Sequence, residues 1–350
     1  MTASLLGRRC AFAVTSALLA TSLTLAPAAT AAPVFDNAET TLDPYAYGNA
    51  IPHTGNATCS AVPTENETPV PVVENGPAAT ATGTATATYA NSDDGADNAT
   101  GNATMTATGR VASVGGNPST IDMTFKGEAH LDNALGTSPN CARNIFAGAD
   151  LNYEFTVATA GFLTVRMSAK GGYAEIYVAK RDGLHSDSLP FIDLYADQKS
   201  LEVTGRAYLT PGTYGGYFEA SVGRRSRSSY DQVMTGQLHA EFHVAGSRTA
   251  KVKGAGQRFV SLPKARSCAK HSLSPKLTKN KARSGAIKQV RFYVNDKATK
   301  KVTKIKRGGK VKLRIADGAS AAVRAVVVTK ATKAKPSRTY EVKTAYEACS

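Results

Sequence analysis

Residues 79–88 alternate strictly between a small apolar residue and threonine. The even-numbered positions from 80 to 88 are all threonine, and the odd-numbered positions are alanine or glycine. Successive side chains of a β-strand point to opposite faces, whereas a helix repeats every 3.6 residues. The pattern therefore predicts a strand with one small apolar face and one threonine face.

The same pattern resumes after a loop of turn-forming residues, 91–98, at Thr104, Thr106 and Thr108. This spacing predicts a β-hairpin. Short strand candidates then follow one another, separated by glycine, proline, asparagine and aspartate, and no segment between them has helical periodicity. We therefore predict an all-β, antiparallel, jelly-roll-like β-sandwich over residues 76–245. Its later strands are expected at 120–130, 151–157, 162–168, 174–178, 200–203, 213–222 and 237–244.

A second, smaller β module is predicted over residues 266–350. Val290, Phe292 and Val294 alternate with polar residues, and Gly308-Gly309 marks a turn. About 85 residues with five to seven strands are typical of an immunoglobulin-like β-sandwich. Residues 246–265 are polar, basic and glycine-bearing, which predicts a linker between the two modules.

The N-terminus has the three parts of a secretory signal. Arg8 and Arg9 precede an apolar stretch at 10–25, and residues 26–32 are small or turn-forming, with cleavage expected after Ala31 or Ala32. No apolar run reaches the roughly 18 residues of a membrane-spanning helix. We predict a signal peptide over 1–32, a secreted or cell-surface protein, and an irregular lead-in over 33–75.

Four cysteines remain after removal of the signal: Cys59, Cys141, Cys268 and Cys349. An even number in an exported chain indicates two disulfides, and four cysteines permit three pairings. We favour Cys59–Cys141 and Cys268–Cys349, because each pair then lies within one module. A metal site is disfavoured by the absence of Cys-x-x-Cys spacing.

Charge is divided unevenly along the chain. Residues 246–350 contain 28 Lys and Arg against 4 Asp and Glu, whereas residues 1–245 contain 14 against 23. Such a division of charge indicates the kind of partner that a protein binds and does not predict its fold.

Eight basic residues between positions 300 and 314 cluster around one predicted hairpin and form the candidate binding site. Lys310, Lys312 and Arg314 alternate there with apolar residues. Several share one strand face by period two, so their fields add, and an anionic envelope polymer or polysaccharide is the expected partner, with nucleic acid bound only non-specifically. A solvated surface, or docking on the acidic N-terminal module, is also compatible with this charge. The residues are Lys300, Lys301, Lys304, Lys306, Arg307, Lys310, Lys312 and Arg314.

Two sets of residues are weaker candidates for metal binding. One combines imidazoles with a carboxylate on one strand face, as zinc ligands do, and the other places three carboxylates in one loop, as calcium ligands. A polar strand face and a solvated hairpin tip explain the same residues, so we expect neither metal nor cofactor. The sets are His239, Glu241 and His243, and Asp93, Asp94 and Asp97.

Other candidate functions have less support. Tyr45 with Tyr47, or Tyr214 with Tyr217, could stack on sugars, although the chain has no tryptophan. The threonine face has the regularity of ice-binding surfaces, but threonine also simply favours strands. Neither a G-x-S-x-G elbow nor an H-E-x-x-H helix is present, so we predict no enzymatic activity.

Residues 150–222 resemble the bacterial pre-peptidase C-terminal type of β-sandwich. The resemblance lies in 153–157 (YEFTV), 160–165 (AGFLTV), 174–178 (AEIYV) and 209–214 (LTPGTY). Residues 290–295 (VRFYVN) resemble a strand of bacterial immunoglobulin-like domains, and the whole chain is similar to secreted proteins of actinobacteria. These resemblances imply non-catalytic modules of secreted or cell-surface proteins.

We therefore predict a secreted, non-enzymatic binding or adhesion protein of the cell exterior, attached through its basic C-terminal module. The alternative is a carbohydrate-binding or accessory module that acts beside a separate secreted enzyme. The oligomeric state is left open by the sequence.

Overall fold

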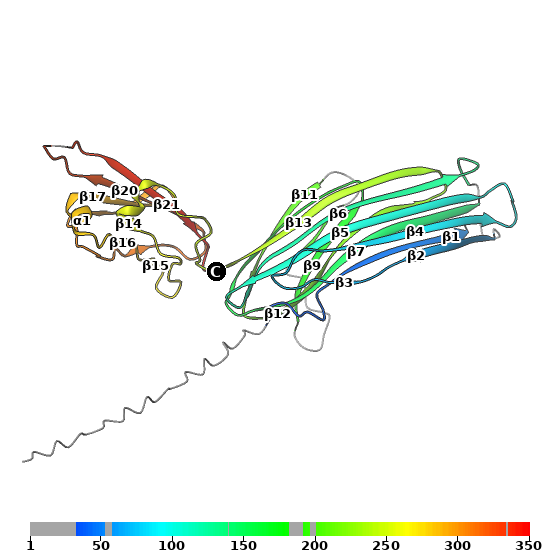
Figure 1. Cartoon of the computed structure of the whole chain (residues 1–350), viewed down its shortest axis with the longest axis horizontal. Helices are drawn as coiled ribbons and strands as arrows, with labels where there is room; N and C mark the ends of the chain where they lie inside the picture. The colour runs from blue at the N-terminus through cyan, green and yellow to red at the C-terminus, as the bar shows by residue number, and fades with distance from the viewer. Residues whose placement is uncertain (1–32, 53–57, 139, 182–191, 197–200, 334) are drawn as a thin grey trace, which may run out of the picture. The chain divides into compact units, whose positions relative to one another are not determined.

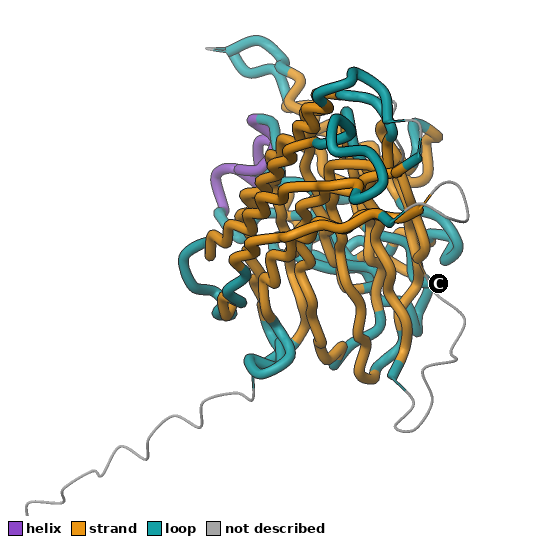
Figure 2. The backbone as a smooth tube through the Cα atoms, turned by 90° about the vertical axis from the view of Figure 1, so that its right-hand side faces the viewer, coloured by secondary structure: helices purple, strands orange, loops and turns teal. Residues whose placement is uncertain are grey.

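The computed structural model describes residues 33–52, 58–138, 140–181, 192–196, 201–333 and 335–350 (Figure 1). Buried apolar side chains in these residues form two hydrophobic cores, one from Val34 to Phe242 and the other from Phe259 to Tyr346. Strands supply most of the regular structure around both cores (Figure 2). The all-β fold is thus confirmed, whereas the predicted signal peptide, 1–32, lies outside the described residues.

Two antiparallel sheets enclose the first core. The six-stranded sheet has the order β10-β9-β12-β7-β1-β3, and the seven-stranded sheet has the order β11-β8-β13-β6-β5-β4-β2. Side chains from both sheets meet in one core, which defines a β-sandwich. The strands are β1 (Thr41–Pro52), β2 (Cys59–Asn66), β3 (Val70–Pro71), β4 (Ala79–Asn91), β5 (Ala99–Val114), β6 (Asn117–Asn133), β7 (Cys141–Val157), β8 (Gly161–Lys170), β9 (Tyr173–Lys180), β10 (Ile192–Ala196), β11 (Leu201–Leu209), β12 (Gly212–Ser226) and β13 (Tyr230–Val244).

The alternating segment forms β4 and pairs with β5, as the sequence predicts. Alanine and glycine of β4 face the core, whereas its threonines lie on the outer surface. Register places threonines opposite one another, and the hydroxyl groups of Thr80 and Thr108 are hydrogen-bonded at 3.0 Å. Small residues therefore line much of the interior on this side of the sandwich.

The expectation of an irregular segment over 33–75 is wrong. This segment contains β1, β2 and β3, and β1 pairs with β7 along twelve positions from Thr41 to Pro52. Its inward residues include Pro44, Ala46 and Gly48, which are buried but too small or too turn-like to show a hydrophobic period. Pairing with the distant strand β7 determines the conformation.

The second core is surrounded by shorter elements. A four-stranded antiparallel sheet has the order β18-β17-β20-β21, and two-stranded ladders join β14 to β16 and β15 to β19. None of the described helices has the length and apolar character needed to cross a membrane. The elements are η1 (Ala255–Arg258), β14 (Val260–Ser261), β15 (Ser272–Leu273), β16 (Lys276–Leu277), α1 (Lys281–Ala286), β17 (Ile287–Val294), β18 (Lys297–Val302), β19 (Leu313–Arg314), β20 (Ala321–Thr329) and β21 (Thr339–Tyr346).

Residues 246–265 are part of this second fold rather than a linker. Phe259, Val260 and Leu262 are buried in the second core. The backbone of Lys253 pairs with that of Lys343 in β21. The linker prediction followed the polar and basic composition and gave no weight to these three apolar residues. Their burial depends on contacts with residues far along the chain.

Both predicted disulfides are present. Cys59 in β2 is bonded to Cys141 in β7, and Cys268 is bonded to Cys349. The first bond links an edge strand of the seven-stranded sheet to a strand of the six-stranded sheet. It therefore ties the two layers of the sandwich together.

Candidate functional site

The predicted basic residues lie on two different structures rather than around one hairpin. Lys300 and Lys301 belong to β18, which pairs with β17, whereas β19 pairs with β15. The expected alternation at 310–315 is nevertheless present: Lys310, Lys312 and Arg314 are exposed, and the residues between them are buried. The hairpin expectation failed because β18 pairs with the preceding strand β17, whereas β19 pairs with β15, about 40 residues earlier in the chain.

Residues 308–311 instead pair with residues 275–278. Leu277 N donates to Gly309 O at 2.9 Å, Gly308 N donates to Thr278 O at 3.0 Å, and Val311 N donates to Pro275 O at 2.9 Å. This antiparallel ladder places Lys276 directly opposite Lys310.

Five basic side chains gather at this ladder. Arg307 Nε donates a hydrogen bond to the carbonyl oxygen of Lys279, and Lys306 belongs to the turn that leads into Gly309. All five residues are exposed. We name this set, Lys276, Lys279, Lys306, Arg307 and Lys310, the cationic ladder.

Lys276 and Lys279 were missed by the sequence interpretation. The signal that could have identified Lys276 is a short period-two pattern, in which Leu273, Pro275 and Leu277 are buried and Lys276 is exposed. The segment was too short to be recognised as a strand without its partner.

The cationic ladder lacks nearby counter-charges in the described chain. In the described chain, no carboxylate oxygen lies within 4.0 Å of a side-chain nitrogen of the cationic ladder. Elsewhere in the module, Arg324 and Lys343 are paired with Glu341. Like charges directly opposite each other destabilise a β ladder. A bound polyanion would relieve this repulsion.

The outer face of the six-stranded sheet has the opposite charge. Asp43, Asp150, Glu219 and Glu175 lie directly opposite one another on β1, β7, β12 and β9. Strands are about 4.8 Å apart, so this row of four carboxylates extends about 14 Å. Within the described residues, no lysine or arginine nitrogen lies within 4.0 Å of any of them.

Tyrosine side chains surround this carboxylate row. Tyr45 Oη donates to Glu219 Oε1 at 2.7 Å, and Tyr217 Oη donates to Glu175 Oε1 at 2.7 Å. Tyr173 also donates to Glu175. We name the four carboxylates together with Tyr45, Tyr173, Tyr177, Tyr195 and Tyr217 the acidic tyrosine face.

A glycine makes room for one of these rings. A Cβ atom at Gly148 would lie 2.2 Å from Cζ of Tyr45, so only glycine lets the ring lie across β7 towards Glu219. On the other side of the face, the rings of Tyr177 and Tyr217 are stacked with centroids 5.6 Å apart. Several tyrosine hydroxyl groups and rings therefore contact other residues of the acidic tyrosine face. The negative charge of the carboxylates is its main property towards a binding partner.

Asp150 is the most perturbed carboxyl group of this face. Burial, followed by the negative charges of Glu219 and Asp43, raises the pKa of Asp150 to about 7. Its Oδ1 atom is buried and has no hydrogen-bond partner among the described residues. Ionised Asp150 is therefore unfavourable in the folded protein.

Asp150→Asn should stabilise the protein in a pH-dependent way. Because the folded-state pKa lies above the ordinary value, ionisation of Asp150 costs stability as pH rises from about 4 to 7. We expect the variant to be more stable than wild type by about 1–2 kcal/mol at pH 8, after allowance for partial exposure, and equally stable near pH 4. Urea unfolding at both pH values measures this, with exposed Asp132→Asn as the control. A gain that is the same at both pH values would contradict it.

The zinc candidates are engaged in separate pairs. His239 Nδ1 lies 2.6 Å from Asp122 Oδ1, and His243 Nε2 lies 3.0 Å from Glu241 Oε1. Among the described residues, no group of three or more His, Cys, Asp or Glu side chains is arranged to hold a metal ion.

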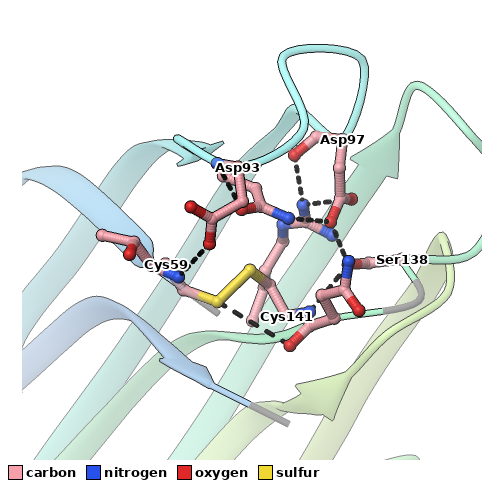
Figure 3. The surroundings of a disulfide bond; sticks show 9 residues. Cys59, Asp93, Asp97, Ser138 and Cys141 are labelled. Atoms are coloured by element: carbon pink, nitrogen blue, oxygen red, sulfur yellow. Dashed lines mark hydrogen bonds and ion pairs between the residues drawn. A yellow bond between two sulfur atoms is a disulfide. The ribbon is translucent and has the colours of Figure 1, made fainter. Parts of the chain in front are cut away.

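Two of the three calcium candidates, Asp93 and Asp97, make different contacts (Figure 3). Asp93 accepts a hydrogen bond from Thr58 N at 2.8 Å at the surface. Asp97 is fully buried, where it accepts hydrogen bonds from Arg143 at 2.7 Å and Ser138 at 2.6 Å. Asp97 thus anchors the loop to the sandwich beside the Cys59–Cys141 disulfide.

The tyrosine pairs proposed for sugar stacking are only partly found. Tyr45, Tyr47 and Tyr217 lie on the outer face of the six-stranded sheet, whereas Tyr214 is fully buried and donates to Thr210 O at 2.9 Å. Tyr214 and Tyr217 are three positions apart in one strand, so they face opposite sides.

No family model matches this chain, and no curated protein matches it. The resemblances to pre-peptidase C-terminal and immunoglobulin-like modules therefore stay predictions.

Proposed function

We propose that this protein is an exported, non-enzymatic binding protein that attaches to an anionic polymer of the cell envelope through the cationic ladder. The observation that supports the proposal is the direct opposition of Lys276 and Lys310, with Lys279 and Arg307 beside them and no carboxylate within ion-pair distance in the described chain. Such a surface has a strong positive field and favours a ligand with closely spaced negative charges.

The two disulfides and the secretory-type leader support a location outside the cell, where such polymers occur. Polyanion binding by lysine and arginine depends mainly on charge and counterion release, not on a shaped pocket. The exposed ladder meets this requirement without any catalytic group.

Glutamine at all five ladder positions should weaken binding to a polyanion such as polyphosphate or purified teichoic acid by about 1,000-fold or more at low salt, because each cation contributes about 1 kcal/mol. The slope of log affinity against log salt should decrease by about 3–5. Affinity electrophoresis or titration calorimetry of the mature chain measures both quantities.

A charge-matched variant provides the control. It carries glutamine at Lys251, Lys253, Lys330, Lys333 and Lys335, which are exposed residues outside the cationic ladder. This variant should retain most of the affinity. Equal losses in the two variants would show that total charge, rather than the ladder, determines binding.

A further inference from the structure

The acidic tyrosine face is a sheet surface of defined charge. It displays four carboxylates in one row on four adjacent strands, and no cation of the described chain pairs with them. Tyr195, next to this row on the edge strand β10, is 66% exposed. Tyrosine and arginine are the residue types enriched in protein interfaces, and exposed rings attract lysine and arginine cations.

The cationic ladder complements this face in both charge and size. Lys276 and Lys279 are three residues apart, which spans about 10 Å in extended chain, compared with about 14 Å for the carboxylate row. The ladder has excess positive charge, and the face has excess negative charge. Both surfaces belong to the same chain, so every molecule carries one of each.

We propose that the acidic tyrosine face binds the cationic ladder of a second copy of this chain, giving head-to-tail association. The two surfaces differ, so the contact is heterologous and leaves one surface of each kind unused at the ends of a dimer. Further copies then add to these ends. The inference shares the ladder with the proposed polymer binding, and the two functions compete for it.

Association of this kind depends strongly on salt. Exposed charges are screened over about 8–10 Å at physiological ionic strength, which is less than the length of the carboxylate row. We expect the wild-type chain to form dimers and larger species at low salt, with an affinity that falls roughly tenfold or more between about 20 and 200 mM salt. Sedimentation velocity over a range of protein concentrations measures the species directly.

A complementation experiment tests the pairing of the two surfaces. One variant carries Asp43→Asn, Glu175→Gln and Glu219→Gln, and the other carries glutamine at Lys276, Lys279, Arg307 and Lys310. Each variant alone should remain monomeric, because it lacks one of the two surfaces. An equimolar mixture should form dimers and nothing larger, because the first variant retains a ladder and the second retains an acidic face.

The control variant removes three carboxylates from the outer face of the other sheet, through Glu128→Gln, Asp132→Asn and Asp231→Asn, and should associate like the wild type. Thermal unfolding monitored by circular dichroism verifies that all variants are folded. Self-association of either test variant, or a mixture that remains monomeric, would overturn the proposal. The proposal would also be overturned if the wild type is a monomer and either variant is more expanded than the wild type. That result would indicate that the ladder docks on the acidic face of the same chain.

Polymer binding separates this inference from the proposed function. The acidic-face variant should bind polyphosphate at least as well as the wild type while losing self-association. If it loses self-association and the ladder variant still binds polyphosphate normally, the proposed function fails and the head-to-tail contact stands.

Discussion

Asp97→Ala is expected to lower the free energy of unfolding by about 3–5 kcal/mol, because it leaves the buried guanidinium of Arg143 without its counter-charge. Both side chains are completely buried, and Arg143 Nη2 lies 2.7 Å from Asp97 Oδ1. Ser138 and Asn91 also donate to Asp97, so the replacement removes three hydrogen bonds to its carboxylate. Urea unfolding at neutral pH measures the loss.

The pH dependence of wild-type stability provides a second measurement. Burial by itself raises the pKa of Asp97, but hydrogen bonds from Arg143, Ser138 and Asn91 outweigh it and hold the pKa below its ordinary value. A lowered pKa gives stability that is complete above about pH 4 and is lost as pH falls further. Asp97→Ala should therefore lose stability relative to wild type at pH 7 and approach it in strong acid.

Surface and interior controls distinguish this role from a general effect of the loop. Asp93→Ala removes an exposed carboxylate that accepts one backbone hydrogen bond, and should cost about 1 kcal/mol or less.

Combining Asp97→Leu with Arg143→Met replaces the ion pair with apolar groups, and should restore much of the stability. If the double variant loses as much unfolding free energy as the two single variants lose together, Asp97 and Arg143 are not coupled.

Removal of the Cys59–Cys141 disulfide by paired alanine replacements should destabilise the sandwich by about 4–5 kcal/mol in the chain-entropy model. The bond joins residues separated by 82 positions, so it restricts a long loop of the unfolded chain. Differential scanning calorimetry of the oxidised wild type and the variant measures the change. Reduction of the wild type should destabilise the sandwich as well, but it also cleaves Cys268–Cys349.

The Cys268–Cys349 bond closes a loop of similar length, with a separation of 81 positions. It joins the segment before β15 to the segment after β21, so its removal should destabilise the packing around Phe292 and Tyr346. Fluorescence of the tyrosines cannot separate the two cores, but amide hydrogen exchange can. Loss of protection in β4 and β5, rather than in β17 and β20, would contradict this assignment.

Local periodicity was sufficient to predict the strands whose two faces differ clearly in chemistry. β4 and β5 are examples, because alanine and threonine alternate over many residues. The disulfide pairing followed from assigning each cysteine pair to one module, and the structure confirms it. These features depend on residues close in sequence or on simple counting.

The remaining features depend on partners far apart in sequence. Lys276 becomes part of a binding surface only because its segment pairs with residues 308–311. The carboxylate row forms only when four strands pair in the observed register. Two of its members, Asp43 and Glu219, are 176 positions apart in the sequence. No local pattern in the sequence contains that register.

The small residues that line the sandwich interior have a consequence for where ligands can bind. A Cβ atom at Gly127 would lie 2.7 Å from both Met105 Cε and Val222 Cγ1, and one at Gly48 would lie 2.7 Å from the Cβ of Ala87. The layers are so close at these positions that even a methyl group has no space. A ligand therefore cannot enter between the layers at Gly48 or Gly127, and one that binds over these strands has to lie on the outer face of a sheet.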